Sequence, residues 1–299
     1  MLNLAPFKTN GNLEIIHTIA ALKAVLEPIK KGNAKVALVP TMGALHDGHL
    51  SLIATAKTYA SIVVCSIFVN PTQFTEPKDL EKYPRPLAHD IKMLTDAGCD
   101  FVFMPTVKEM YPEFPKPEDW HIDLGKAEFL LEGEFRKGHY QGVTQIVKKL
   151  IDAVDPAIAF FGQKDFQQVL MIKNMVQHFN MPLEIVSCPI IREDDGLAMS
   201  SRNIHLSAED RKNALVLSKA LQFVKDNFAN LPLKDLLAKA KGMINEVDGV
   251  ELDYFTIADG KTLLPAEDKL IENPVALVAA KVGETRLIDN MLLGLGQNL

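Results

Sequence analysis

Residues 34–49 read AKVALVPTMGALHDGH and show the pattern on which the predicted fold rests. It opens with an apolar run of strand length and continues through a loop that holds Gly43 and Gly48. Apolar residues at helical spacing then follow up to residue 60. A buried strand that passes through a glycine-containing loop into a helix is the opening unit of a parallel α/β sheet.

The same alternation of strand and helix patterns continues to about residue 190. The run SIVVCSIFV at 61–69 is almost continuously apolar and rich in β-branched residues, which is typical of a parallel strand covered on both faces. Further strands are predicted at 100–104, 157–161 and 183–187, and helices at 48–60, 86–97, 142–154 and 165–179. We therefore predict an α/β fold with a Rossmann-like parallel sheet over residues 1–190, whose ligands bind at the carboxyl ends of the strands.

The pattern changes after about residue 191. Ser207 can cap a long helix, and residues 233–247 predict a second one. Strands are expected at 250–257 and 275–281, with a possible edge strand at 286–289. Two helices followed by strands indicate a smaller α+β domain over residues 191–299. Because no flexible linker or low-complexity tract separates the two parts, we expect them to pack closely.

The composition is that of an ordinary globular protein, with 47% hydrophobic and 23% charged residues. A net charge of -6 argues against a nucleic-acid-binding protein, which needs a basic surface. The three cysteines, without a CxxC spacing, are expected to be buried and reduced. The N-terminal sequence MLNLAPFKTNGNLE holds no apolar signal core, and no apolar run is long enough to span a bilayer. We therefore expect a cytoplasmic protein without a membrane segment.

The loop after the first strand carries two histidines, His46 and His49, where the predicted helix begins. Their spacing of three places both rings on one helix face. Gly43 and Gly48 allow a ligand to approach the backbone, and the unpaired amides of a helix start favour an anion. Solvated or capping histidines are the alternative, as is a zinc site, although no third ligand stands nearby. The position after a buried strand favours phosphate binding.

The second strand runs into the loop that carries Asn70 and Gln73. Their carboxamides can both donate and accept hydrogen bonds, which suits the recognition of a hydroxyl or a carboxylate. An ordinary proline turn with solvated polar residues explains this loop equally well.

The loop after the strand at 157–161 carries Lys164, a cation at the same predicted edge of the sheet. Gly162 allows close approach, Asp165 can cap the helix or accept a hydrogen bond from a ribose hydroxyl, and Gln168 lies one turn further on. The alternative is an ordinary N-cap beside a surface lysine. We prefer the ligand site because Lys164 shares its sheet edge with the histidines.

A fourth segment, IREDDGLAMSSRN at 191–203, joins the two predicted domains. The hydroxyls of Ser200 and Ser201 and the guanidinium of Arg202 can together clamp a polyphosphate. A charged interdomain loop is the alternative, but its position favours a loop that closes over a nucleotide. Arg136 and His139 form a further basic cluster to which the sequence assigns no role.

Taken together, these motifs resemble those of known nucleotide-dependent enzymes. The histidine pair and the distant Met-Ser-Ser-Arg loop resemble the HIGH and KMSKS pair of the nucleotidyltransferase superfamily. The ordered set PTMGALHDGH, FVNPTQF, DLEKYPR, GHYQGV, FGQKDFQQV and GLAMSSRN resembles the pantothenate synthetase (pantoate–β-alanine ligase) family over essentially the whole chain.

The resemblance implies which residues bind each substrate. His49 matches the family's proton donor, and Gln73 and Gln168 match its pantoate-binding glutamines, with Gln73 also near β-alanine and Asn70 expected beside it. Further catalytic groups are expected at His46, Lys164, Ser200, Ser201 and Arg202. The implied ATP site comprises Met42, Gly43, Ala44, Leu45, His46, Asp47, Gly48, His49, Gly162, Gln163, Lys164, Asp165, Ile191, Met199, Ser200, Ser201 and Arg202. Gln163 stands where Glu is common, and Gln145 stands where Thr is usual.

The reaction implied has two steps. The pantoate carboxylate attacks the α-phosphorus of ATP to give pantoyl adenylate and pyrophosphate, and the β-alanine amine then displaces AMP. The resemblance further implies Mg²⁺ held mainly by ATP oxygens, a lid formed by residues 191–299, and a homodimer.

Three other functions compete with this interpretation. A transferase that moves the nucleotide to a phosphorylated acceptor should have more Lys and Arg near its pocket than the neutral Asn70, Gln73 and Gln168 provide. An aminoacyl-tRNA synthetase is disfavoured by the acidic net charge. A non-catalytic nucleotide-binding module would not need the histidines, the lysine and the Ser-Ser-Arg loop together.

Overall fold

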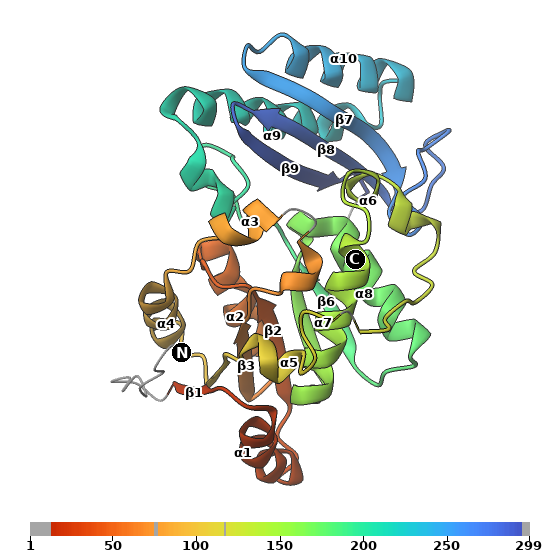
Figure 1. The fold of residues 1–299 in the computed structure, drawn as a ribbon. Coiled ribbons are helices and arrows are strands. Elements are labelled where there is room, and N and C mark those ends of the chain that lie inside the picture. Colours follow the sequence, from red (N-terminus) through yellow and green to blue (C-terminus); the bar gives the residue numbers. More distant parts are fainter. Residues whose placement is uncertain (1–12, 75–76, 117, 295–299) are drawn as a thin grey trace. The chain divides into compact units, whose positions relative to one another are not determined.

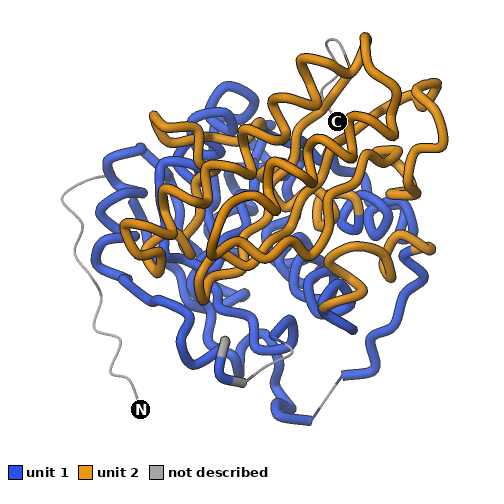
Figure 2. Tube along the Cα trace, turned by 90° about the horizontal axis from the view of Figure 1, so that it is seen from above, with its two compact units in different colours: residues 1–124, 136–161, 171–188 blue, residues 125–135, 162–170, 189–299 orange. Residues whose placement is uncertain are grey.

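The computed structural model describes residues 13–74, 77–116 and 118–294 (Figure 1). We expected no apolar signal core in residues 1–14, and most of this stretch, residues 1–12, lies outside the described part. The chain divides into two compact units. Unit 1 comprises residues 1–124, 136–161 and 171–188, and unit 2 comprises residues 125–135, 162–170 and 189–299 (Figure 2). No helix within the described ranges is long and apolar enough to cross a membrane.

Unit 1 is built on a parallel sheet of six strands in the order β1-β4-β3-β2-β5-β6. Its strands are β1 (Glu14–Ile16), β2 (Val36–Thr41), β3 (Ile62–Ile67), β4 (Phe101–Phe103), β5 (Ile158–Gly162) and β6 (Glu184–Cys188). The pairs β1–β4, β4–β3, β3–β2 and β2–β5 are all parallel. The predicted Rossmann-like sheet is therefore confirmed, and β2, β3 and β5 end at the same edge.

Both faces of this sheet are buried, as the near-continuous apolar strands require. Val39, Val63 and Cys65 face one side, in a core that also contains Ile53 of a covering helix. Leu38, at the alternate position of the same strand, is equally inaccessible to solvent.

The helices of this region are α1 (Ile19–Lys31), α2 (Asp47–Tyr59), α3 (Pro77–Lys82), α4 (Leu87–Asp96), α5 (Val107–Met110), α7 (His139–Val154) and α8 (Phe166–His178). The four helices predicted there are all present, whereas β1 and α1 were not predicted. The helix α7 begins three residues earlier than the predicted 142. Gly142 lies inside α7, where its missing side chain lets the helix pack against Thr72 and Gln73.

Unit 2 holds an antiparallel sheet of β7 (Val250–Asp259), β8 (Pro274–Val282) and β9 (Thr285–Leu292). Its main helices are α9 (Ala208–Asn227) and α10 (Leu233–Asn245), and a short helix, α6 (Glu132–Phe135), comes from the middle of the sequence. The Ser207 hydroxyl accepts from the Asp210 amide at 3.1 Å, as predicted for the cap of α9. The expected α+β part and its edge strand are confirmed.

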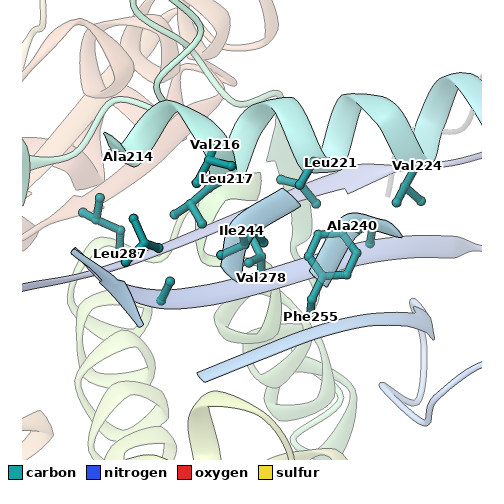
Figure 3. Packing of buried hydrophobic residues seen from close by; sticks show 14 of the residues in the cluster. Ala214, Val216, Leu217, Leu221, Val224, Ala240, Ile244, Phe255, Val278 and Leu287 are labelled. Carbon is teal, nitrogen blue, oxygen red and sulfur yellow. The ribbon is translucent and has the colours of Figure 1, made fainter. Parts of the chain in front are cut away.

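The core of unit 2 lies between this sheet and its helices (Figure 3). Phe255 and Val278 from the sheet pack in one cluster with Leu217 and Leu221 of α9 and Ile244 of α10. Each of these side chains is almost wholly removed from water. Apolar burial of this kind holds the edge strand β9 against its neighbours and gives it a defined position.

The three cysteines, Cys65, Cys99 and Cys188, are buried and not disulfide-bonded, as predicted. Burial raises the pKa of the Cys99 thiol to about 12 and that of Cys65 well above its usual value. Because the thiolate is the reactive form, these side chains act as small apolar residues of the core.

Candidate active site

The loop after β2 turns sharply, with Gly43 at φ 79° and Ala44 at φ 51°. The Gly43 amide donates to the Thr41 hydroxyl at 3.1 Å, which fixes the start of the turn. A Cβ on Gly43 would come within 2.9 Å of an Asp90 carboxylate oxygen, so this position requires glycine for space as well as for conformation.

Asp90, on α4, holds this loop in place and was not identified in the sequence. Its two carboxylate oxygens accept hydrogen bonds from the amides of Ala44 at 2.9 Å and Leu45 at 2.8 Å. Burial raises the pKa of Asp90, while these two amides lower it. The available signal was an acidic residue on the buried face of α4, beside Ile91 and Leu94.

The histidine pair stands at the start of α2, with His46 at the N-cap. The ring centroids of His46 and His49 are 4.1 Å apart, which confirms that both rings lie on one face. The His46 amide donates to Nδ1 of His49 at 3.3 Å. Because Nδ1 accepts, a neutral His49 carries its proton on Nε2, which makes Nε2 the hydrogen-bond donor of the ring. His49 therefore caps the start of α2, as one of our alternatives had it, and it does so through Nδ1 rather than through its Nε2 donor.

The carboxamide of Asn70 makes several hydrogen bonds within the protein. The Nδ2 atom donates to Gly142 O at 3.1 Å and to Gln73 Oε1 at 3.2 Å, and Oδ1 accepts from the Tyr111 hydroxyl at 2.9 Å. Asn70 is completely buried. Both N–H donors of Asn70 are thus occupied within the protein and its carboxamide helps to shape the loop, while its role in substrate binding stays a prediction.

Tyr111 was missed in the sequence, since it lies in a loop distant from the motifs. Burial raises its pKa to about 12, so it remains a neutral hydroxyl that can donate to Asn70.

Gln73 is oriented by several neighbours within unit 1. Its Nε2 donates to the Met42 sulfur at 3.0 Å, which brings the ends of the first two loops together. Its backbone carbonyl accepts from Nδ1 of His139 at 2.8 Å. Arg136 Nη1 lies 3.0 Å from His139 Nε2, and because a guanidinium only donates, the ring is neutral with its proton on Nδ1. The predicted basic cluster is therefore in part a buried support for Gln73.

The third candidate segment follows β5 directly. Residues Gln163–Asp165 form a 3-10 turn that continues into α8. Asp165, which we expected to cap the helix, is the last residue of this turn and directly precedes α8. Gly162 directly precedes the turn. Lys164 and Gln168 are both partly accessible to solvent. Within residues 13–74, 77–116 and 118–294, the Lys164 ammonium has no ion-pair partner, so its charge is available to a ligand.

The fourth segment forms a tight hairpin before the Ser-Ser-Arg turn. The Met199 amide donates to Ile191 O at 3.0 Å, and the hairpin reverses at Gly196. Ser200 caps the 3-10 turn Ser201–His205 by accepting from the Arg202 amide at 3.2 Å. Arg202 itself is exposed.

Two of the three acidic residues of this segment, Glu193 and Asp195, are paired within the protein. Arg211 binds Glu193 at 3.2 Å and Asp195 at 2.9 Å. Their negative charges are thereby partly neutralised next to the Ser-Ser-Arg turn, which favours an anion-binding loop over a merely charged connection.

Comparison with known proteins decides the family. The family model described as "Pantoate-beta-alanine ligase" matches residues 14–292. A pantothenate synthetase of Bacteroides fragilis is 45% identical over 280 residues, which cover 93% of this chain and 98% of the relative. One of Thermotoga neapolitana is 44% identical over 286 residues, covering 94% and 100%.

The chain belongs to the pantoate–β-alanine ligase family. It is accordingly a carbon–nitrogen ligase that forms pantothenate, as the family resemblance implied.

Solved structures of family members agree in fold. Pantothenate synthetase from Thermus thermophilus superposes with a TM-score of 0.87 at 40% identity, covering 94% of this chain and 99% of the other. A pantoate–β-alanine ligase from Francisella tularensis, crystallised with β,γ-ATP and β-alanine, has a TM-score of 0.75 at 35% identity, covering 94% and 98%. The family fold thus extends over both units of this chain.

Each unit brings together part of the family's predicted site. In unit 1, Met42 and Gln73 are in contact, and His46 and His49 lie side by side. In unit 2, one strand, β9, contacts both the Lys164 turn and the Ser201–His205 turn. Sequence motifs identified the segments, but they did not identify the buried residues that form hydrogen bonds with them: Asp90, Tyr111, Asp289 and Asn290.

Proposed function

We propose that this chain condenses pantoate with β-alanine through an enzyme-bound pantoyl adenylate, using the residues assigned above. In the first step a pantoate carboxylate oxygen attacks the α-phosphorus of ATP, and the bond to the β,γ-diphosphate breaks to release pyrophosphate. In the second step the neutral β-alanine amine attacks the acyl carbon, the acyl–phosphate bond breaks, and AMP leaves with the bonding electron pair. The amine loses a proton as the amide forms.

The single observation that carries the ATP site is the geometry of His49. Its Nδ1 accepts from the start of its own helix, so the neutral ring presents an N–H donor at Nε2. A donor at a helix N-terminus can stabilise the charge that develops on phosphate oxygens during adenylation. His46 and the loop from Met42 to Gly48 complete this part of the proposed site.

The remaining phosphate contacts come from unit 2. Lys164 supplies a cation, while Ser200, Ser201 and Arg202 supply two hydroxyls and a guanidinium that suit the leaving pyrophosphate. Mg²⁺ enters as part of the Mg·ATP substrate, coordinated by triphosphate oxygens. Among the described residues, no group of three His, Cys, Asp or Glu side chains is placed to hold a metal ion.

The pantoate site is proposed around Gln73 and Gln168. Gln73 keeps one amide N–H beyond its bond to Met42, and this donor can bind a pantoate hydroxyl or carboxylate. Neutral carboxamides suit a small hydroxy acid better than they suit a phosphorylated acceptor, which favours cationic partners.

We further propose the cellular and structural setting. Residues 191–299 act as a lid that protects the reactive adenylate from water, over the ATP site of residues 1–190. The enzyme is a cytoplasmic homodimer, and light scattering should give a mass of twice the 33.1 kDa of one chain.

A product assay tests the function. The protein is incubated with Mg·ATP, pantoate and β-alanine while AMP and pyrophosphate are measured, and each substrate is omitted in turn. AMP formation should depend on all three substrates, whereas pyrophosphate should appear without β-alanine in an amount near one per active site. A transferase acting on a phosphorylated acceptor would release pyrophosphate without AMP. Absence of pantoate-dependent AMP would overturn the proposal.

A further inference from the structure

The edge strand β9 touches two segments of the proposed ATP site. It contacts the turn Gln163–Asp165, which carries Lys164, and the turn Ser201–His205, which follows Ser200. All of these residues belong to unit 2. Two adjacent residues of the strand, Asp289 and Asn290, make the polar contacts described next.

Asn290 binds the Lys164 turn through its carboxamide. The Nδ2 atom donates to the carbonyls of Gln163 at 3.0 Å and Lys164 at 2.9 Å, and Oδ1 accepts from Gln163 Nε2 at 3.0 Å. Backbone carbonyls only accept, so the orientation of the carboxamide is determined by its partners. These three bonds engage both the NH₂ group and the oxygen of the carboxamide, and only 2% of Asn290 is exposed to solvent.

Asp289 binds the other segment. Its carboxylate accepts two hydrogen bonds from the Arg192 guanidinium, at 2.7 Å and 3.0 Å. Arg192 also donates to Gly196 O at 3.1 Å and thereby ties the hairpin that precedes the Ser-Ser-Arg turn. Burial raises the pKa of Asp289, and Arg192 and Lys164 act in the opposite direction.

We propose that Asp289 and Asn290 are positioning residues of the ATP site, which hold the Lys164 turn and the Arg192 hairpin at a set distance from each other. The inference rests on the proposed function, because Lys164 and Ser200 to Arg202 are assigned to ATP through it. Neither Asp289 nor Asn290 is assigned contact with a substrate.

Their burial supports a positioning role over a simple contribution to stability. An apolar pair at these two positions could pack against the unit at least as well, since removing a carboxylate from water costs free energy that its ion pair only offsets. Directional bonds, in contrast, restrict the Lys164 turn and the Arg192 hairpin to one arrangement. A site that binds a triphosphate needs such restriction, because catalytic groups must be held to within fractions of an ångström.

Gln163 bears on this arrangement, because it departs from the Glu that is common at this position. A carboxylate there could not donate to Asn290 Oδ1. Gln163 and Asn290 therefore form a matched pair of neutral amides in this chain.

The test compares Asn290→Ala with the control Asn227→Ala. Asn227 also donates through its carboxamide to a backbone carbonyl, that of Phe223 at 2.9 Å, but it lies on α9, outside the proposed ATP segments. For Asn290→Ala we expect the KM for ATP and the Kd for Mg·ATP, measured by calorimetry, to rise about tenfold, as for the loss of two or three hydrogen bonds. The KM for β-alanine should change less than about twofold, and Asn227→Ala should resemble the wild type.

A double-mutant cycle separates positioning from a general loss of structure. Gln163→Ala alone should raise the Kd for Mg·ATP about threefold, since it removes one of the bonds, and it should add little when Asn290→Ala is already present. If Asn290→Ala does not fold, Gln163→Ala still tests the pair from the side of the turn. An unchanged Kd for Mg·ATP in folded Asn290→Ala, or in Gln163→Ala, would overturn the inference.

The two proposals fail in different ways. If the wild type binds Mg·ATP but forms no pantoate-dependent AMP, the proposed function is wrong. The ATP-binding measurements on the variants still decide whether β9 positions the nucleotide site.

Discussion

His49 is the residue on which the proposed chemistry depends most directly. In His49→Ala the helix start loses the acceptor of the His46 amide and the ligand loses its Nε2 donor. We expect pantoate-dependent AMP formation to fall at least about 100-fold, as for other preorganised donors to a developing charge. Thermal unfolding should change little, because His49 is partly exposed.

His121→Ala is the matched control for this prediction, because His121 is exposed and lies outside all four motifs. Its rate of AMP formation should equal that of the wild type. Near-normal turnover in His49→Ala would show that the proton donor has been misplaced.

The buried carboxyl group of Asp90 should make the free energy of unfolding depend on pH. Burial raises its pKa above the ordinary 3.8, so the folded protein binds this proton more tightly than the unfolded chain. The stability contributed by this group is therefore greatest below pH 3.8 and falls as the pH rises through the raised pKa. Asp90→Asn lacks the titration, so its stability relative to the wild type should improve as the pH rises from about 4 to about 7.

Urea unfolding of the wild type and Asp90→Asn across this range measures the effect. A difference between the two free energies of unfolding that stays constant with pH would contradict the assignment. At every pH, Asp90→Asn should also weaken ATP binding, because the carboxamide NH₂ would face the amide of Ala44 or Leu45.

At the scale of elements, the packing of α7 on the loop after β3 depends on one glycine. A Cβ on Gly142 would meet Thr72 O, and it would lie 2.7 Å from Thr72 C and 2.8 Å from Gln73 Cα. Because the neighbouring atoms are backbone, they cannot move aside cheaply. Gly142→Ala should therefore destabilise the protein by about 1–3 kcal/mol and raise the KM for pantoate through Gln73.

Gly242→Ala provides the contrast, since Gly242 lies inside α10 and a Cβ there would meet nothing within 4 Å. Alanine has the higher helix propensity, so this variant should be more stable by about 0.5–1 kcal/mol, with unchanged KM values. Chemical unfolding of both variants checks the pair. Equal effects of the two substitutions would show that helix propensity, rather than packing on the loop, decides the outcome at Gly142.

At the scale of the whole molecule, residues 125–135 belong with a sheet far along the sequence. Arg286 of β9 binds Glu132 of α6 through both oxygens, at 2.6 Å and 2.8 Å. The Tyr254 hydroxyl donates to Glu132 at 3.1 Å, and the Phe135 ring stacks on that of Tyr254. Gln167, at the start of α8, accepts from the Glu132 amide at 3.1 Å.

Breaking the ion pair between Glu132 and Arg286 should loosen residues 125–135. Arg286→Ala leaves the Glu132 carboxylate, which is only 8% exposed, without its cation, at a cost of about 3 kcal/mol. Limited proteolysis should then cut within residues 125–135 faster than in the wild type. Lys261→Ala, which removes an exposed ion pair with Glu272, should change neither stability nor cleavage. Unchanged cleavage in Arg286→Ala would show that Glu132 and Arg286 do not hold the segment.

The sequence by itself determined the alternation of elements, the parallel sheet and the positions of the four candidate segments. These follow from local chemistry: apolar runs of strand length, helical spacing, and glycines where a turn needs a positive φ, as at Gly43. The histidine pair was likewise readable, because a spacing of three in a helix places two rings together without any tertiary contact.

Which buried residues contact these segments depends instead on the tertiary structure. Asp90 lies 46 residues from the amide of Ala44, and Asn290 lies 126 residues from the carbonyl of Lys164. The Asn70 carboxamide likewise donates to the carbonyl of Gly142, 72 residues away. The reason is physical: a buried polar group must find a hydrogen-bond partner, and which partner lies within about 3 Å is set by the packing of distant elements, not by local sequence.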